Sequence, residues 1–315
     1  MKKILLIFAL ILTLSAACFA FTACGDENDN SSEGLVFVSN DDGTCYVADI
    51  GTCTDTDIVI PSVSPEGWEV TSIGDRAFKD CTGLTSVTIP DSVRSIGEWA
   101  FYYCLSLTRV TIGNSVTSIG YGAFSSCYKL VEVINHSSLN ITKGSSSHGY
   151  IGACAKEVHK GESKIVNYND YLFYTYDGLN YLLGYAGRDT ALVLHESYNG
   201  ENYEIYDYAF YERKDITSVT IGNSVTSIGK YAFRNCTSLT SVTIGDSVTS
   251  IGNYAFRGCT SLTGVNIPDS VTSIGNDAFS GCTSLTIYCE AASEPSGWDY
   301  YWNYSGGSVV WGYNG

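Results

Sequence analysis

The residues of this chain best suited to chemistry are its 12 cysteines, and half of them recur at one spacing. Intervals of 23 residues separate the members of two groups, which are Cys81, Cys104 and Cys127, then Cys236, Cys259 and Cys282. Thiols arranged in this way could form disulfides, bind zinc or fill small buried spaces. No Cys-x-x-Cys pair supports zinc, and three stacked thiols cannot all pair with one another. We therefore predict buried free thiols, and leave open whether Cys45 and Cys53 form a bridge.

The other reactive groups do not assemble into a catalytic motif. The four histidines are scattered, and the chain has neither a His-Glu-x-x-His pair nor a nucleophile elbow. Many aspartates lie at turns such as Pro90-Asp91-Ser92, where they act as turn formers rather than as an acid–base pair. We accordingly predict no catalytic residue, no cofactor and no metal ligand, and we do not expect an enzyme.

The fixed spacing extends to the apolar residues around the cysteines. An Ala-Phe pair recurs with phenylalanine at positions 78, 101 and 124, and again at 210, 233, 256 and 279. Residues 216–238 and 239–261 differ at only four positions. Copies at a constant period place like groups in columns. Because one coil cannot bury its apolar stripe alone, successive coils must stack.

Each copy specifies its own short elements. In a stretch such as Leu-Thr-Ser-Val-Thr-Ile, the alternation and the β-branched residues predict a strand with Leu, Val and Ile on its buried side. A turn follows, then a second extended edge at Val-x-x-Ile-Gly, then a turn that contains Ala-Phe. The residues between the buried ones form a flat, weakly charged face, unless threonine is present only because it favours strands. This face supplies candidate partner-binding residues: Ser86, Thr88, Arg109, Thr111, Ser218, Thr220, Ser241, Thr243 and Asn266.

A second group of candidates is aromatic. Eleven tyrosines occur between Tyr168 and Tyr211, among Asn-Gly and Asp-Gly loops. Exposed tyrosine among flexible polar residues is typical of adaptable binding surfaces and of sugar stacking. The same rings could instead fill a wide coil. We keep both interpretations, with Tyr174, Tyr176 and Tyr185 as the candidate contacts.

The whole repeat reads Leu-x-x-Val-x-Ile-Pro/Gly-x-x-Val-x-x-Ile-Gly-x-x-Ala-Phe-x-x-Cys. This unit resembles the BspA-type leucine-rich repeat family, and the resemblance covers nearly all of the chain beyond residue 34. It implies a leucine-rich repeat solenoid of stacked coils with a parallel β-sheet face. It also implies adhesion, to host matrix proteins or to other bacteria.

The period is interrupted once, and residues 171–195 echo residues 35–61, so a second array starts with its own starter coil. We still expect one elongated solenoid with about nine stacked strands. The predicted segments are a lipoprotein signal peptide (1–24), a flexible tether (25–33), a starter coil with the first array (34–134), an irregular connecting segment (135–170), a second starter coil and array (171–289) and an aromatic C-terminal cap (290–315).

Two of these segments have expected local structure. Residues 150–160 of the connecting segment are predicted to form one short helix. In the cap, Trp298, Trp302 and Trp311 are expected to cover the apolar end and the unpaired edge of the last coil.

The N-terminus has the pattern of an export signal, with two lysines, an apolar stretch and a small-residue end. Phe21-Thr22-Ala23-Cys24 resembles a bacterial lipobox, so lipid attachment is predicted at Cys24, with ordinary cleavage and release as the alternative. The acidic residues that follow suit a flexible tether. We expect a protein exported and lipid-anchored at the bacterial cell surface, with no other membrane contact.

The formal net charge of −16 argues against a nucleic-acid partner, because clustered Lys and Arg supply most of that affinity. The leading hypothesis is a non-enzymatic surface protein that binds an extracellular protein along an extended face, as an adhesin. The alternatives are a carbohydrate-binding and a purely structural envelope lipoprotein.

Overall fold

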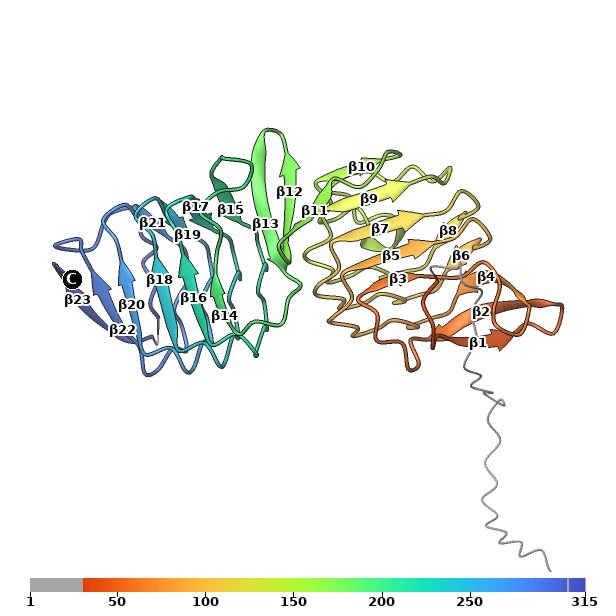
Figure 1. Cartoon of the computed structure of the whole chain (residues 1–315), viewed down its shortest axis with the longest axis horizontal. Helices are drawn as coiled ribbons and strands as arrows, with labels where there is room; N and C mark the ends of the chain where they lie inside the picture. Colours follow the sequence, from red (N-terminus) through yellow and green to blue (C-terminus); the bar gives the residue numbers. More distant parts are fainter. Residues whose placement is uncertain (1–30, 305, 315) are drawn as a thin grey trace, which may run out of the picture.

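The computed structural model describes residues 31–304 and 306–314. Within them the chain forms a β-solenoid of about 12 coils with about 23 residues per turn, which confirms the predicted fold class. The only helical element of this described part is the 3-10 turn η1 (His148–Tyr150). The strands form four sheets, two in each of two arrays (Figure 1).

The first array contains two five-stranded sheets, A and B. Sheet A contains, in spatial order, β1 (Val36–Ser39), β2 (Thr44–Asp49), β4 (Glu69–Ile73), β6 (Ser95–Ile96) and β8 (Ser118–Ile119). Sheet B contains β10 (Glu157–His159), β9 (Glu132–Asn135), β7 (Arg109–Ile112), β5 (Ser86–Ile89) and β3 (Asp57–Val59). All pairs are parallel except β1 with β2.

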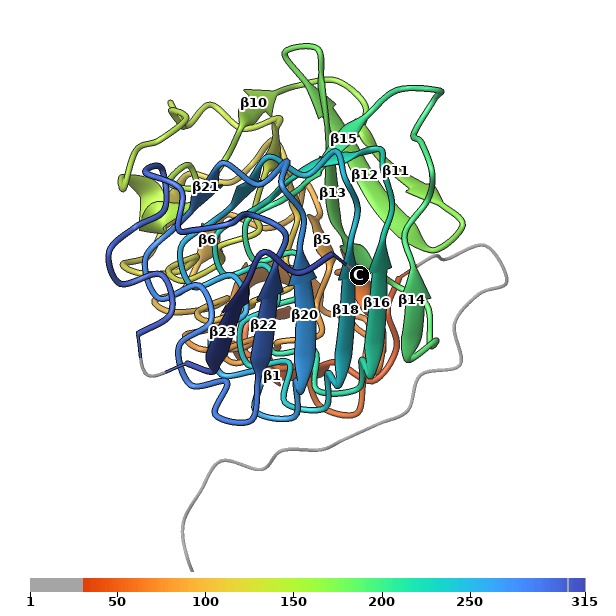
Figure 2. The ribbon, with the colours of Figure 1, turned by 90° about the vertical axis from the view of Figure 1, so that its left-hand side faces the viewer.

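The second array contains sheets C and D, with seven and six strands. Sheet C contains β11 (Ile165–Tyr168), β12 (Tyr171–Tyr176), β13 (Leu179–Tyr185), β15 (Tyr203–Ile205), β17 (Val225–Ile228), β19 (Ser250–Ile251) and β21 (Ser273–Ile274). Sheet D contains β14 (Ala191–Val193), β16 (Ser218–Ile221), β18 (Ser241–Ile244), β20 (Gly264–Ile267), β22 (Thr286–Cys289) and β23 (Ser308–Trp311). Seen from the C-terminal end, the strands of sheet D lie side by side along one wall of the coil (Figure 2).

The repeated residues produce these coils by alternation and by stacking. In β18, Val242 and Ile244 are buried while Ser241 and Thr243 point outward, as a half-buried strand requires. The phenylalanines form two columns of parallel rings whose centroids lie 4.9 to 5.2 Å apart. At each ring the backbone also pairs with the next coil, for example from Phe233 N to Ala255 O at 2.7 Å. Each coil therefore forms the floor for its successor.

Structures outside the regular repeat cover the start of each array and the end of the second array. Antiparallel hairpins, β1–β2 and β12–β13, begin the two arrays. At the C-terminus, Trp298 and Trp302 are buried against the last coil, and Trp298 Nε1 donates a hydrogen bond to Val271 O at 3.0 Å. The partly buried Trp311 packs on the same core, as predicted for the cap.

The expected short helix over residues 150–160 is wrong. Only Tyr150 of this range belongs to the turn η1, and Glu157–His159 form β10, which pairs in parallel with β9 and so extends sheet B by one strand. This segment is extended rather than helical because the unpaired edge of β9 offers backbone hydrogen bonds that a neighbouring strand can form.

The solenoid expected with about nine stacked strands has about 12 coils, and its strands divide between two arrays. Sheet B ends at β10, sheet D starts at β14, and the strands of the two arrays run in different directions (Figure 1). The last coil of the first array explains this break. Thr85 and Thr108 occupy one position of the repeat in the earlier coils, and the last coil has Val131 there. Val131 is fully buried in a small core with Tyr174 and Leu183 of the second array.

Candidate binding surfaces

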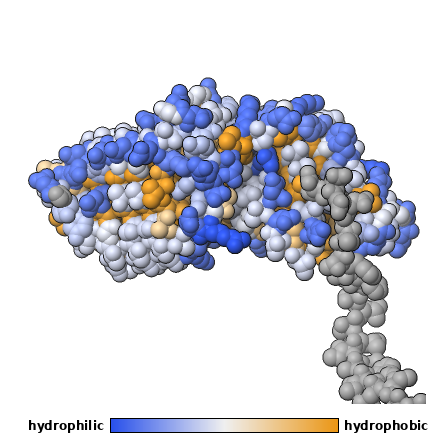
Figure 3. Space-filling model, in the orientation of Figure 1, coloured by the Kyte–Doolittle hydropathy of each residue, from blue (hydrophilic) through white to orange (hydrophobic). Residues whose placement is uncertain are grey.

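Sheet D carries the candidate residues that remain open to solvent. Its outward row of Ser218, Ser241 and Gly264 is aligned in register across three strands. Thr220, Thr243 and Asn266 form a second outward row, all of them exposed. Figure 3 shows this side of the second array as pale and weakly polar, with apolar patches and a strongly hydrophilic rim. The surface is flat, uncharged and uncovered, so it suits a broad contact.

The same positions on sheet B differ in exposure and in chemistry. Ser86 is buried and donates a hydrogen bond to Asp57. Arg109 donates to Ser86 Oγ at 3.1 Å and to Ser163 Oγ at 3.0 Å, and its guanidinium lies 3.5 Å from Asp57. Thr88 and Thr111 are half-buried. These predicted candidates are therefore engaged within the protein, most of all Ser86.

The next residue in this row, Glu132, is completely buried. Its carboxylate accepts hydrogen bonds from Ser163 Oγ and from the Lys164 backbone, both at 2.7 Å. His159 Nε2 lies 3.1 Å from the same carboxylate. A buried charge needs such partners, and here the segment between the arrays supplies them. Sheet B is thus locked to the connecting segment at its last coil.

The three candidate tyrosines mostly support the second interpretation, in which the rings fill the starter coil. Tyr174 is fully buried, and its hydroxyl donates to Glu157 at 3.0 Å. Tyr185 is buried, and its hydroxyl donates to Asp189 at 2.9 Å. Only Tyr176 is partly open, and Lys143 Nζ donates to its hydroxyl at 3.0 Å. Burial removes the rings of Tyr174 and Tyr185 from any surface contact.

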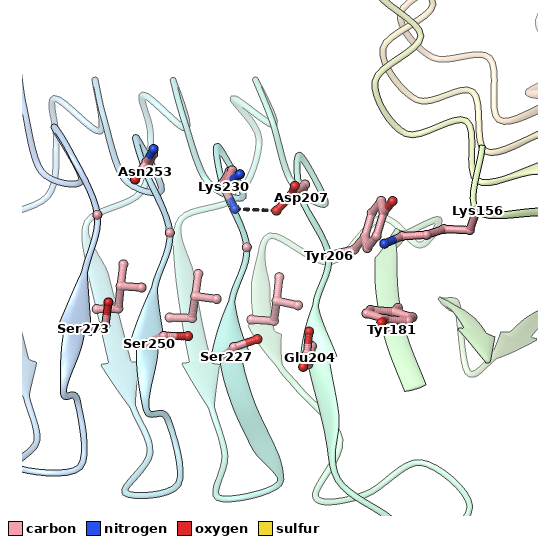
Figure 4. A pocket seen from close by; sticks show the side chains of 16 residues that line it. Lys156, Tyr181, Glu204, Tyr206, Asp207, Ser227, Lys230, Ser250, Asn253 and Ser273 are labelled. Carbon is pink, nitrogen blue, oxygen red and sulfur yellow. Dashed lines mark hydrogen bonds between the residues drawn. The ribbon is translucent and has the colours of Figure 1, made fainter. Parts of the chain in front are cut away.

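A groove that was not predicted lies over sheet C. It has a volume of about 340 Å³ and follows β15, β17, β19 and β21 (Figure 4). Its floor carries a row of hydroxyls from Ser227, Ser250 and Ser273, each in register with its neighbour. At one end of the groove, Lys156 from the connecting segment lies with its Nζ 5.4 Å from the ring centroids of both Tyr181 and Tyr206.

The two arrays also share a buried lysine. Lys129 Nζ donates to Ala209 O at 2.7 Å and to Leu183 O at 3.4 Å. Burial, with the nearby Arg213 guanidinium, lowers the pKa of Lys129 from 10.5 to about 7. Its neighbour Tyr128 stacks on Tyr208 of the second array with centroids 4.6 Å apart.

Sequence reasoning missed this junction although it carried a signal. Other coils have small or aliphatic residues such as Thr82, Leu105 and Ser106 at the positions of Tyr128 and Lys129. The departure from the repeat at these two positions was the available clue.

The cysteine column consists of free thiols, and all but Cys81 of the six periodic cysteines are buried. The buried thiols donate to the phenylalanine carbonyl 26 residues earlier, for example Cys259 to Phe233 at 3.0 Å and Cys104 to Phe78 at 3.2 Å. Burial raises the pKa of Cys236 from 9.0 to about 12. Cys45 and Cys53 are also free thiols. A protonated, buried thiol is a poor nucleophile, so the column has a packing role.

The predicted lipid attachment residue, Cys24, lies outside the residues that the structure describes. Across the described residues, no helix has the length and apolar character needed to traverse a bilayer. The same residues contain no cluster of three His, Cys, Asp or Glu side chains placed to hold a metal ion.

The coil geometry and its columns define a leucine-rich repeat solenoid. Residues 53–180 and 203–290, more than half of the chain, match the family described as "BspA type Leucine rich repeat region" in six copies, and the protein belongs to this family. The resemblance drawn from the repeat unit is thereby confirmed. Proteins with these repeats are generally non-enzymatic scaffolds, and membership indicates a role in protein interaction or at a surface.

Several solved structures are similar to this chain. A leucine rich cell surface protein from Faecalibacterium prausnitzii is 24% identical, over 90% of this chain and 97% of that one, with a TM-score of 0.35. A leucine-rich repeat protein from Bacteroides capillosus is 31% identical, over 41% of this chain and 100% of that one, with a TM-score of 0.37. One from Bacteroides ovatus is 22% identical, over 90% of this chain and 91% of that one, with a TM-score of 0.29. A search of curated protein sequences gave no match.

Proposed function

We propose that this protein is a non-enzymatic surface adhesin that binds an extracellular protein, on host matrix or on another cell, through the outward face of sheet D. The observation that carries the proposal is the open face itself. Six strands present uncharged residues such as Thr220, Thr243 and Asn266, and no other part of the described chain covers them. Membership of the BspA-type family and the surface location named for the relative from F. prausnitzii support it.

The chemistry of this face favours a broad contact over a deep pocket. Its two rows repeat serine and threonine from β16 to β18 and continue with other uncharged residues on β20 and β22, so each coil adds one stripe of contact. Val193 and Val310 are exposed at its two ends and add apolar area that a protein partner can bury. The acidic net charge of −16 favours a partner that is not itself strongly acidic.

The proposal includes export and lipid anchoring at Cys24, which would present the solenoid outside the cell. The lipobox-like Phe21-Thr22-Ala23-Cys24 and the acidic segment after it support this part. Metabolic labelling with an alkyne fatty acid tests it. We expect label on the wild-type chain and none on Cys24→Ser, and label on both would overturn the anchoring site.

The test of the binding face uses matched variants on the two sheets. Thr220→Glu with Thr243→Glu places two like charges in the middle of sheet D, while Thr88→Glu with Thr111→Glu makes the same change on sheet B. Retention on immobilised matrix proteins should fall for the first pair and stay near wild type for the second. Equal retention of both pairs would contradict the proposal.

Coil deletion provides a second readout. Removing residues 239–261 shortens sheet D by one strand and should weaken binding in a graded way, because repeat stability is a sum over neighbours. Binding to glycans alone would support the carbohydrate alternative. Loss of envelope integrity in a deletion strain, without any binding partner, would support the structural one.

A further inference from the structure

We infer that the groove over sheet C is a binding site for a neutral oligosaccharide, with Lys156, Tyr181, Tyr206 and Glu204 at its head and a row of serines as its floor. This groove lies on a different sheet from the proposed adhesive face. The inference therefore stands independently of the proposed function.

The floor of the groove is a regular series of hydroxyls. Glu204, Ser227, Ser250 and Ser273 are neighbours in register on β15, β17, β19 and β21, and they lie in one row in Figure 4. Their spacing is that of paired strands, about 4.8 Å. Within the described residues, none of the three serine hydroxyls has a side-chain hydrogen bond. Each one is free to donate and to accept.

Beside this row of serines, glycines leave the backbone without covering side chains. Gly229, Gly252 and Gly275 follow the serines by two positions, and each also lines the groove. A Cβ at any of them would lie 2.6 Å from a backbone nitrogen of the preceding coil. Side chains are therefore excluded there by the stacking of the coils, which leaves backbone exposed to a ligand.

The head of the groove concentrates unpaired charge and aromatic surface. The rings of Tyr181 and Tyr206 meet edge to face at 5.5 Å, and Lys156 Nζ lies 5.4 Å from each ring centroid. Within the part of the chain that is described, neither Lys156 Nζ nor the Glu204 carboxylate forms a hydrogen bond or an ion pair. The head thus offers donors, an acceptor and apolar ring surface within one site.

These groups select the chemistry of the ligand. A ligand fits the serine row if it has hydrogen-bond donors and acceptors at intervals that match the distance between coils. A saccharide with hydroxyls around each ring has this property. Its C–H faces can pack on the partly exposed ring of Tyr206, which the buried Tyr181 supports from below. A polyanionic glycan is disfavoured, because Glu204 and Asp207 line the groove together with Lys156 and Lys230, and the net charge of the protein is −16.

An extended peptide is a poorer match for the floor. A peptide strand binds a sheet by main-chain hydrogen bonds at a free edge. The floor strands β15, β17 and β19 are already paired on both sides. Recognition must therefore use side chains, and here these are hydroxyls.

The first array provides a matched internal control. Ser72, Ser95 and Ser118 form the same row on sheet A. This row ends against η1, where Phe124 N donates to Gly149 O at 2.7 Å. The serines are thus repeated in both arrays, but the open cationic and aromatic head occurs only beside sheet C in the described chain.

The experiment is titration of the chain from residue 31 to residue 315, which includes every described residue, with named probes by isothermal calorimetry and saturation-transfer NMR. The probes are the tetramer of β-1,4-linked N-acetylglucosamine, cellotetraose, mannotetraose and a heparin tetrasaccharide. We expect at least one neutral probe to bind and to be preferred over heparin. Ser227→Ala with Ser250→Ala should weaken that probe about tenfold, which is about 1.4 kcal/mol.

The controls separate the site from the scaffold. Ser72→Ala with Ser95→Ala makes the same change in the first array and should leave the affinity within about twofold. Lys156→Ala should lower affinity while thermal unfolding stays near wild type, because its ammonium is not part of a buried ion pair. The inference is overturned if no neutral probe binds, if heparin binds more tightly, or if the first-array variant is equally harmful.

Discussion

The outward rows of sheets B and D occupy the same positions of the repeat, yet they have become different surfaces. On sheet B the row runs through Asp57, Ser86, Arg109 and Glu132, which bind one another or the connecting segment. On sheet D the matching row has small uncharged residues, and within the described residues the side chains of Ser218 and Ser241 on β16 and β18 form no hydrogen bond. The buried positions of the repeat build the scaffold, so the outward positions are free to diverge.

The largest expected effect tests whether the two arrays are separate folding units. Their cores are separate clusters, and the contacts between them are the small group around Val131 and Tyr174, the hydrogen bonds of Lys129 and the Tyr128–Tyr208 stack. Phe101→Ala and Phe233→Ala each remove one ring from a stacked column, which should cost about 3–5 kcal/mol. Hydrogen exchange should rise mainly in the array that carries the change. A uniform rise across both arrays would show one cooperative unit.

The second prediction compares equivalent positions on the two sheets. Glu132→Ala removes a buried carboxylate and leaves Ser163 and His159 without their partner, which should cost about 3 kcal/mol. Ser241→Ala changes the corresponding position on sheet D and should stay within about 0.5 kcal/mol of wild type. Chemical denaturation monitored by tyrosine and tryptophan fluorescence measures both. Equal costs would remove the distinction between the sheets.

The third prediction concerns the pH dependence of the junction. The native pKa of Lys129 is about 7 against 10.5 in the unfolded chain, so the unfolded chain binds more protons between these values. The contribution of Lys129 to stability should therefore rise with pH across this window. Relative to Lys129→Met, the wild type should gain about 1.5 kcal/mol between pH 7 and 8.5.

The difference between wild type and variant is the quantity to plot. The cysteines act in the opposite direction, because the raised pKa of Cys236 gives stability that is lost as pH rises above about 9. Both chains share this loss, so the subtraction cancels it. A flat difference between pH 7 and 8.5 would mean that the ammonium stays charged in the folded protein.

The smallest effect is expected in the thiol column. Cys104→Ala in the first array and Cys259→Ala in the second should each cost about 1 kcal/mol, from a small cavity and a lost weak hydrogen bond. Mass spectrometry of alkylated, unreduced protein checks the redox state. Disulfides among the six periodic cysteines would show that the column is a covalent staple.

The fold was predictable from the sequence because its period is strict. The columns of Phe256 and Cys259 follow from spacing alone, and so do the strands whose alternation matches Ser241–Ile244. The arrangement of the two arrays was not predictable in this way. It depends on how single residues such as Lys129 and Val131 pack against a segment more than 50 residues away.

The candidate sites were predictable only in part. Outward strand positions follow from alternation, and Thr220 and Thr243 are indeed exposed. The burial of Tyr174 and Tyr185 could not be read from composition, because the starter hairpin folds over the last coil of the first array. The head of the sheet C groove joins Lys156 to Tyr181 across the connecting segment, and no periodicity links these residues.

The bend between the two arrays has a mechanical consequence. Tension on a protein held near β1 and pulled from sheet D would not run along a single stack, because the stacks lie in different directions (Figure 1). The second array would then act as a lever arm, and torque would concentrate on the bonds of Lys129 and on the stacked rings of Tyr128 and Tyr208. We expect single-molecule pulling to open this joint first, as a short extension step before any coil unravels. A surface protein with such a joint extends under load while both arrays keep their shape.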